Sequence, residues 1–253
     1  MNRTPTEHTH KCSTCVMGQF CLPVGIDAQD MPKVDELIEE RVRLKKGSHI
    51  FQQGEKMNAL YSVRFGTLKS ENILADGRSQ VTSFHLAGEI IGLDGIGNNV
   101  HLSNSIALED SEVCVIKLNE LEKLSLQVPS LQSQFHRILS REISQDHQHL
   151  LTLGTMRAEE RLANFLLNLS ERLSIRGYSA SEFNLKMSRE DIGSYLGVQL
   201  ETVSRLFSRF AETGLIQIKQ RNVKLIDTPS LEKLAGKISN QSTICSIPLK
   251  TTK

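Results

Sequence analysis

Five cysteines are the residues of this chain best suited to chemistry, and three of them crowd together near the N-terminus. Cys12, Cys15 and Cys21 form a C-x2-C-x5-C run, whereas Cys114 and Cys245 follow far downstream. Three thiols this close cannot all form disulfides with one another, and the rest of the chain is unlike a small secreted scaffold. Thiolates at short spacing are soft ligands that suit zinc or an iron–sulfur cluster. The sequence therefore predicts a metal centre in an N-terminal arm.

Two other uses of the thiols stay open on spacing alone. One is a structural zinc site with four thiolate ligands, which His8 and His10 are close enough in sequence to join, although such a distant fourth cysteine is less typical of zinc. The other is a thiol–disulfide oxidoreductase that uses Cys12 and Cys15. That motif would have to open a helix behind a strand, and only a polar segment precedes it.

Length and composition fit a globular protein of two domains. The chain has 253 residues, of which 39% are hydrophobic and 23% charged. No run approaches about 18 apolar residues, and Met1–Lys11 lacks the apolar region of a signal peptide. We therefore expect a cytoplasmic protein with reduced cysteines and no membrane partner. Because no nucleophile-elbow, Walker-type or dinucleotide glycine motif is present, we do not expect an enzyme.

The elements that must position the cysteines begin with a segment of short strands. From Arg43 to about Leu118, glycines and the Asp76-Gly77 turn separate runs rich in Ile, Phe, Val, Tyr and Thr, which predicts a sandwich or barrel. One short helix is expected over Val34–Glu40. From Pro129 to Gly154 apolar residues recur at intervals of three and four, which predicts a helix of about 24 residues or roughly 36 Å. Its apolar seam implies a partner helix, most simply that of a second copy.

Residues 187–216, MSREDIGSYLGVQLETVSRLFSRFAETGLI, have the pattern of a helix-turn-helix. Ser188 and Asp191 form an S-x-x-D capping box, and Gly197 allows the tight turn. Two β segments around Arg221-Asn222 read as a wing. Another helix is expected before this motif, over Ala158–Arg176.

The second helix of such a motif lies in the major groove of DNA. Arg205 can bind guanine O6 and N7, Glu201 can accept from a cytosine amino group, and Ser204 can contact either base. Seven basic against four acidic residues between positions 186 and 224 agree with a surface that faces phosphates. The alternative is a solvated face on which Glu201 and Arg205 pair with each other.

Residues 10–236 resemble the CRP/FNR superfamily of transcriptional regulators, specifically the FNR type named for fumarate and nitrate reduction. The resemblance rests on the cysteine run at 12–21, the distant Cys114, the long helix and the E-T-V-S-R element at 201–205, whose E-x-x-S-R pattern is specific to that branch. It implies an α+β fold with an N-terminal β-roll of the cyclic-nucleotide-binding jelly-roll type, a long dimerisation helix and a C-terminal winged helix-turn-helix. The corresponding parts are a cysteine-rich cluster-binding arm over 1–30, a sensory β-roll over 31–120, the dimerisation helix over 121–154, the DNA-binding domain over 155–236 and a disordered tail over 237–253.

The resemblance also implies a function. A [4Fe–4S] cluster would be held by Cys12, Cys15, Cys21 and Cys114. The cluster-loaded homodimer would bind palindromic double-stranded DNA with TTGAT-like half-sites and would contact RNA polymerase. Breakdown of the cluster by oxygen would lower dimerisation and DNA binding, so that the protein acts as an oxygen-sensing activator or repressor of anaerobic genes.

The chain departs from the cyclic-AMP receptors of the same superfamily at one position. Those receptors hold the cyclic phosphate with an Arg-Ser pair, and the corresponding stretch here reads His101-Leu102-Ser103-Asn104, with leucine in place of arginine. We therefore expect no cyclic nucleotide effector. The tail that contains Cys245 has no family motif.

Ile143, Asp146 and Leu150 fall on the expected dimer seam. There Asp146 would face its symmetry mate, and two close carboxylates repel while their desolvation adds a further cost. We hypothesise that Asp146 keeps the cluster-free protein monomeric until the cluster repositions the helix. The alternative is that Asp146 lies just off the seam and pairs with Arg141 or a nearby Lys or His.

Overall fold

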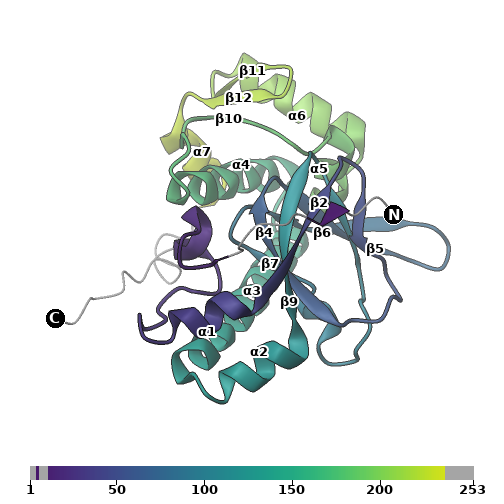
Figure 1. Cartoon of the computed structure of the whole chain (residues 1–253). Helices are drawn as coiled ribbons and strands as arrows, with labels where there is room; N and C mark the ends of the chain where they lie inside the picture. The colour runs from purple at the N-terminus through teal and green to yellow at the C-terminus, as the bar shows by residue number, and fades with distance from the viewer. Residues whose placement is uncertain (1–3, 6–10, 237–253) are drawn as a thin grey trace. The chain divides into compact units, whose positions relative to one another are not determined.

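The computed structural model describes residues 4–5 and 11–236, and these residues form two compact units that divide between Glu142 and Ile143. Figure 1 shows the order of the elements along the chain. The α+β class predicted from the sequence is confirmed. His8, His10 and Cys245 lie outside the described residues, as does the tail predicted over 237–253.

The first unit contains the predicted β-roll. Its described strands pair antiparallel in two sheets, ordered β1-β2-β9-β4-β7 and β3-β8-β5-β6. The strands are β1 (Thr4–Pro5), β2 (Ile38–Leu44), β3 (His49–Phe51), β4 (Ala59–Phe65), β5 (Leu68–Ile73), β6 (Ser79–His85), β7 (Ile90–Ile91), β8 (Asn104–Ala107) and β9 (Ser111–Lys117). The predicted Asp76-Gly77 turn joins β5 to β6, with Gly77 at a φ of 85°.

Strand β9 shows how the first sheet separates two cores. Successive side chains of a strand point to opposite faces. Val113 therefore lies in a cluster with the buried residues of β2, β4 and the second sheet, such as Val42 and Phe51. Cys114 and Ile116 face the other way, into a cluster with residues of the arm and of the helices. The face that carries Cys114 is thus the face that the helical layer covers.

That helical layer consists of short elements and the start of the long helix. Its members are the 3-10 turn η1 (Val16–Phe20), α1 (Met31–Glu36), α2 (Leu118–Ser125) and α3 (Pro129–Thr155). The short 3-10 turn η2 (Leu93–Gly95) follows β7. The prediction of one long helix from Pro129 is confirmed. The prediction of a helix over Val34–Glu40 is wrong in its second half, because the chain already pairs with β9 from Ile38 onward.

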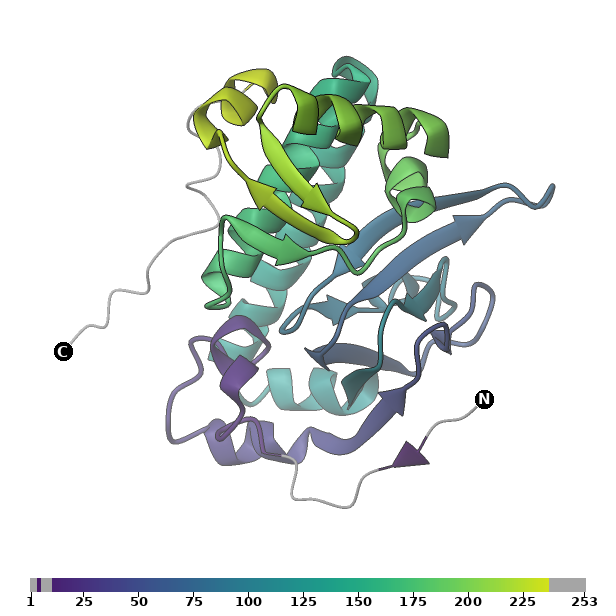
Figure 2. The same ribbon diagram turned by 90° about the horizontal axis from the view of Figure 1, so that it is seen from above.

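The second unit contains the winged helix-turn-helix. It is built from α4 (Ala158–Ile175), β10 (Glu182–Asn184), α5 (Arg189–Leu196), α6 (Leu200–Glu212), β11 (Ile216–Lys219), β12 (Asn222–Leu225) and α7 (Thr228–Leu234). The wing hairpin of β11 and β12 is seen beside the helices in Figure 2. The strand β10 that extends the wing sheet and the closing helix α7 were not anticipated from the sequence.

Local interactions explain why the sequence turns where it does in this motif. The Ser188 hydroxyl accepts from the Asp191 backbone N–H at 3.0 Å, and the Asp191 carboxylate accepts from the Ser188 N–H at 2.8 Å. This is the predicted capping box at the start of α5. Gly197 ends α5 with a φ of 64°, a conformation that glycine adopts without steric cost.

Gly66, between β4 and β5, tests how tightly the β-roll is packed. A Cβ at Gly66 would lie 2.1 Å from the Ser111 hydroxyl oxygen and 2.9 Å from the Ser111 Cα, with φ at 92°. Gly47 has a similar φ of 82° but open space around it. We predict that Gly47→Ala lowers the free energy of unfolding by about 1–2 kcal/mol, and that Gly66→Ala lowers it by roughly 1–3 kcal/mol more because a clash is added. Urea unfolding of both variants checks this, and equal losses would contradict it.

Candidate functional site

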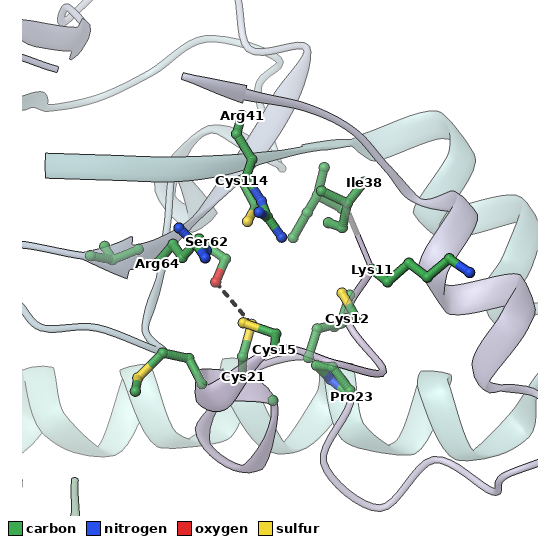
Figure 3. A pocket seen from close by; sticks show the side chains of 15 residues that line it. Lys11, Cys12, Cys15, Cys21, Pro23, Ile38, Arg41, Ser62, Arg64 and Cys114 are labelled. Carbon is green, nitrogen blue, oxygen red and sulfur yellow. Dashed lines mark hydrogen bonds between the residues drawn. The ribbon is translucent and has the colours of Figure 1, made fainter. Parts of the chain in front are cut away.

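The four cysteines singled out by the sequence line a single pocket of the first unit (Figure 3). Cys12, Cys15 and Cys21 come from the arm, on either side of the turn η1, and Cys114 comes from the middle of β9. All four are free thiols. Cys114 is buried and the other three are half-buried. Residues about a hundred positions apart in the sequence therefore contribute sulfur atoms to one place.

The register of three strands fixes what lies beside Cys114. Arg41 of β2 and Ser62 of β4 are its direct partners on either side, so the three residues form a row across the sheet. The Ser62 hydroxyl is 2.8 Å from the Cys21 Sγ. This contact is the dashed line in Figure 3. The row thus meets the arm through a direct contact between side chains.

Hydrogen bonds hold the arm against the rest of the unit. Ser13, between two of the cysteines, donates its backbone N–H and its hydroxyl to the two carboxylate oxygens of Asp35 in α1, at 2.8 and 2.6 Å. The side-chain amide of Gln134 in α3 donates to the Cys21 carbonyl oxygen at 3.3 Å. Leu22, only 1% exposed, anchors the chain directly after Cys21. The arm is therefore attached to α1, to the sheet and to the long helix.

Burial favours the protonated form of three thiols of this pocket, those of Cys12, Cys21 and Cys114, because it raises the pKa of each. Desolvation raises the pKa of Cys12 well above its ordinary value, and the nearby Cys21 and Cys114 sulfurs raise it further. Desolvation also raises the pKa of Cys21 to about 11, although the hydrogen bond with Ser62 opposes this shift. The pKa of Cys114 is also raised by burial, while the positive charge of Arg41 opposes the rise. Thiolates in this pocket therefore require cationic partners, which metal ions supply.

The described residues contain no group of three His, Cys, Asp or Glu side chains arranged to hold a single metal ion. The four thiols line the same pocket without converging on one point. As a donor set, four thiols with no carboxylate or imidazole among them suit an iron–sulfur cluster or zinc. Lys11 lies exposed at the rim of the pocket.

The helix α6 presents the residues predicted to face DNA. Glu201, Ser204 and Arg205 are all exposed, whereas Val203, Leu206 and Phe207 on the other side of the helix are buried. Within the described residues, no ion pair joins Glu201 to Arg205, so the alternative in which they neutralise each other is not found. Arg209, one turn further on, is paired with Glu159 of α4.

The seam residues lie in the second half of α3 and are open to solvent. Ile143 is 56% exposed and Leu150 is 65% exposed, which is unusual for large apolar side chains on a helix. Asp146 is exposed as well, and in the described part of the chain it makes no ion pair with Arg141. Partial desolvation raises the pKa of Asp146, and the neighbouring His147 opposes that shift. His149 stacks on Tyr195 of α5, with ring centroids 4.1 Å apart.

Arg41, Ser62 and Gln134 belong to this site but were not found from the sequence. Each is a common residue type in a segment without a motif, and each reaches the pocket or the arm only through strand register or helix rotation. The local sequence signal for these residues is therefore absent.

Comparison with known proteins places two domains on this chain. The sequence profile of the cyclic nucleotide-binding domain matches residues 41–127, and that of the Crp-like helix-turn-helix domain matches residues 160–234. The transcriptional regulatory protein btr of Bordetella pertussis is 55% identical over 228 residues, which cover 90% of this chain and 94% of that protein.

Other relatives extend this similarity. Electron transport regulator A of Shewanella oneidensis is 44% identical over 225 residues (89% of this chain and 90% of that protein). The fumarate and nitrate reduction regulatory protein of Escherichia coli is 41% identical over 229 residues (90% and 92%). The solved structure of FixK2 from Bradyrhizobium japonicum superposes with a TM-score of 0.71 at 32% identity and covers 77% of this chain and 96% of that one. Across the described residues, every helix is too short or too polar to cross a membrane.

Arg205 gives the sharpest test of base reading by α6. We predict that Arg205→Ala weakens binding to a cognate duplex by roughly 1–3 kcal/mol and relaxes the preference at one base pair, because a bidentate contact to guanine is lost. Lys219→Ala, on the exposed wing strand, is the matched control. This substitution should weaken binding to all duplexes alike. It should also reduce by about 1 the slope of the logarithm of affinity against the logarithm of salt concentration, because one phosphate contact is lost. Binding titrations with single-base variants measure both, and a uniform loss for Arg205→Ala would reassign that residue to phosphate contact.

Proposed function

Because the chain belongs to the CRP/FNR family of transcriptional regulators, we propose that it is an oxygen-responsive member of that family. Members of this family are DNA-binding regulators and not enzymes. In our proposal a [4Fe–4S] cluster on Cys12, Cys15, Cys21 and Cys114 controls whether two copies bind a promoter. The DNA would be a palindrome with TTGAT-like half-sites, and RNA polymerase would be contacted from there. The protein would bind its promoter DNA in the cytoplasm.

One observation carries this proposal, namely that four thiols from two distant segments line one pocket. A mononuclear zinc site explains it less well. Tetrahedral zinc with Zn–S bonds of about 2.3 Å needs thiolates that nearly touch one another. A core of four iron and four sulfide ions holds its thiolates further apart and takes four of them, the number that lines this pocket. Two of the relatives carry names that refer to electron transport and to fumarate and nitrate reduction, and these names support a respiratory role.

The residues around the pocket explain how binding of the cluster would affect the rest of the protein. When bound, the cluster supplies an oxygen-labile link between the arm and β9. Gln134 is only 3% exposed and binds the carbonyl of Cys21. A change in the arm therefore bears directly on α3, nine residues before Ile143 on the same helix. The arm, Gln134 and α3 form a continuous path from the cysteines to the seam.

The exposed seam supports a homodimer. Ile143 and Leu150 are separated by seven residues, the repeat that brings side chains to one stripe of a supercoiled helix pair. A second copy of α3 would bury both side chains and would place the two recognition helices about one turn of DNA apart. Asp146 lies between them and opposes this pairing while it is ionised.

A cyclic nucleotide is not part of the proposal, although a cyclic nucleotide-binding domain matches residues 41–127. In the stretch that departs from the cyclic-AMP receptors, the Leu102 N–H and the Ser103 hydroxyl both donate to Asp94, at 2.9 and 2.8 Å. His101 is buried and stacks on Phe51, with ring centroids 3.6 Å apart. Leu102 and Ser103 thus both donate to a carboxylate of the protein, and Leu102 adds no positive charge for a phosphate.

Anaerobic purification tests the proposed function. We expect the protein to contain four iron and four acid-labile sulfide ions per chain and to bind its palindrome, and we expect air to remove both properties. Cys114→Ser should prevent loading and operator binding, whereas Cys245→Ser is a matched thiol control that should behave as the unchanged protein. Metal and sulfide analysis with a gel-shift assay provides the readout. Oxygen-free protein that contains zinc but no iron would exclude the proposal.

The proposed role of Asp146 is tested on the cluster-free protein. A dimer would desolvate Asp146 further, so the dimer would bind the extra proton more tightly than the monomer. Acidification through the raised pKa of Asp146 should therefore shift the protein toward dimer. Asp146→Ala should be more dimeric at pH 7 and should lose this pH dependence, although His147, His149 and Tyr195 are retained.

Sedimentation equilibrium across the pH range measures the change. Leu150→Ala is the control on the same stripe and should weaken the dimer at every pH, because it removes apolar contact and leaves the charge. An Asp146→Ala protein that stays monomeric with an unchanged pH profile would contradict the proposed role.

A further inference from the structure

Arg41 lines the cysteine pocket together with the four thiols, and this position comes from the sheet. It is the direct partner of Cys114 in the pairing of β2 with β9. A register shift between Ile38 and Glu40 interrupts the regular alternation of side chains along β2. As a result, Ile38 and Arg41 both line the pocket while Val42 faces the opposite core. Figure 3 shows the side chain of Arg41 beside Cys114.

The Nε atom of Arg41 is shielded from solvent and has no hydrogen-bond partner among the described residues. A buried donor without an acceptor costs about 1–3 kcal/mol, and such groups in native structures have a specific reason. The side chain also makes no ion pair within the described part of the chain. The guanidinium of Arg41 therefore reaches the pocket with its Nε–H unpaired, and its charge and a side-chain hydrogen bond oppose the rise in the pKa of Cys114.

The other cations of the pocket differ from Arg41. Arg64 also lines it, but donates to the buried carboxylate of Glu112 at 2.8 Å and so has a charged partner, which Arg41 does not have among the described residues. Lys11 is exposed at the rim, where water screens its charge. Arg43, two residues after Arg41 on the same strand, binds Glu112 at 3.2 Å, has a 63% exposed side chain and does not line the pocket.

We infer that Arg41 is a positioning residue of the metal centre, whose guanidinium balances thiolate charge at Cys114 and whose buried Nε–H is a donor to the sulfur of that centre. This inference rests on the proposed function. Four thiolates on a [4Fe–4S]2+ core carry a net charge of about −2, and a partly desolvated anion needs donors and cations close by. The fork of an arginine supplies both at once, whereas lysine offers charge without a fixed Nε donor.

The test compares anaerobically reconstituted unchanged protein with Arg41→Gln, Arg41→Lys and Arg43→Gln. Three quantities are measured for each: iron and sulfide content, the rate of iron release to a ferrous chelator without oxygen, and the midpoint potential of the centre. Arg41→Gln should release iron roughly 10–100-fold faster, the usual effect of losing an outer-shell partner of a metal ligand. Its midpoint potential should fall because a positive charge that favours the reduced centre is gone. Arg41→Lys should be intermediate and Arg43→Gln unchanged.

The outcomes separate the inference from the proposed function. If the unchanged protein holds four iron and four sulfide ions but Arg41→Gln has the same release rate and potential, only the inference falls. If the unchanged protein holds no cluster, the proposed function and the inference fall together. Circular dichroism of the cluster-free proteins detects a variant that does not fold. In that case the Arg41→Lys variant is the test. Iron release from Arg41→Lys that is no faster than from Arg43→Gln would overturn the role of Arg41.

Discussion

The register of β9 between β2 and β4 fixes the position of the Cys114 sulfur. That register turns Cys114 toward the arm and the helices and turns its neighbour Val113 into the core of the β-roll. Because side chains of a strand alternate, a slip of one residue would bury Val113 among the helices and place the thiol inside the roll. The sulfur of Cys114 is therefore held in place by the whole sheet, whereas the other three thiols belong to an arm with little regular structure. A strand of a paired sheet and an arm attached by side-chain contacts therefore meet at one site.

Several features could be predicted from the sequence because they depend on neighbouring residues. The capping box of Ser188 and Asp191 and the turn at Gly197 are local chemistry, and both occur where the pattern put them. The 27-residue helix from Pro129 is equally local, since its apolar period and its proline start lie within one segment. The C-x2-C-x5-C run singled out three thiols, and the structure brings them and Cys114 to one pocket.

Other features could not be predicted because they depend on tertiary contacts. Uninterrupted alternation would put Ile38 on the same side as Val42, but the irregularity between Ile38 and Glu40 puts it with Arg41 instead. The same pairing explains why the helix expected up to Glu40 ends at Glu36, since the strand has the better partner in β9. Gln134 is one of two glutamines near the start of α3, and only the rotation of the helix selects it to bind Cys21.

X-ray absorption at the iron edge of oxygen-free protein tests whether the four cysteines hold an iron–sulfur cluster. We predict iron surrounded by sulfur together with scattering from neighbouring iron atoms, and we predict that this signal is lost when Cys114 is replaced by serine. Protein with zinc bound to sulfur and no iron–iron scattering would contradict it, as would an iron signal that is indifferent to Cys114.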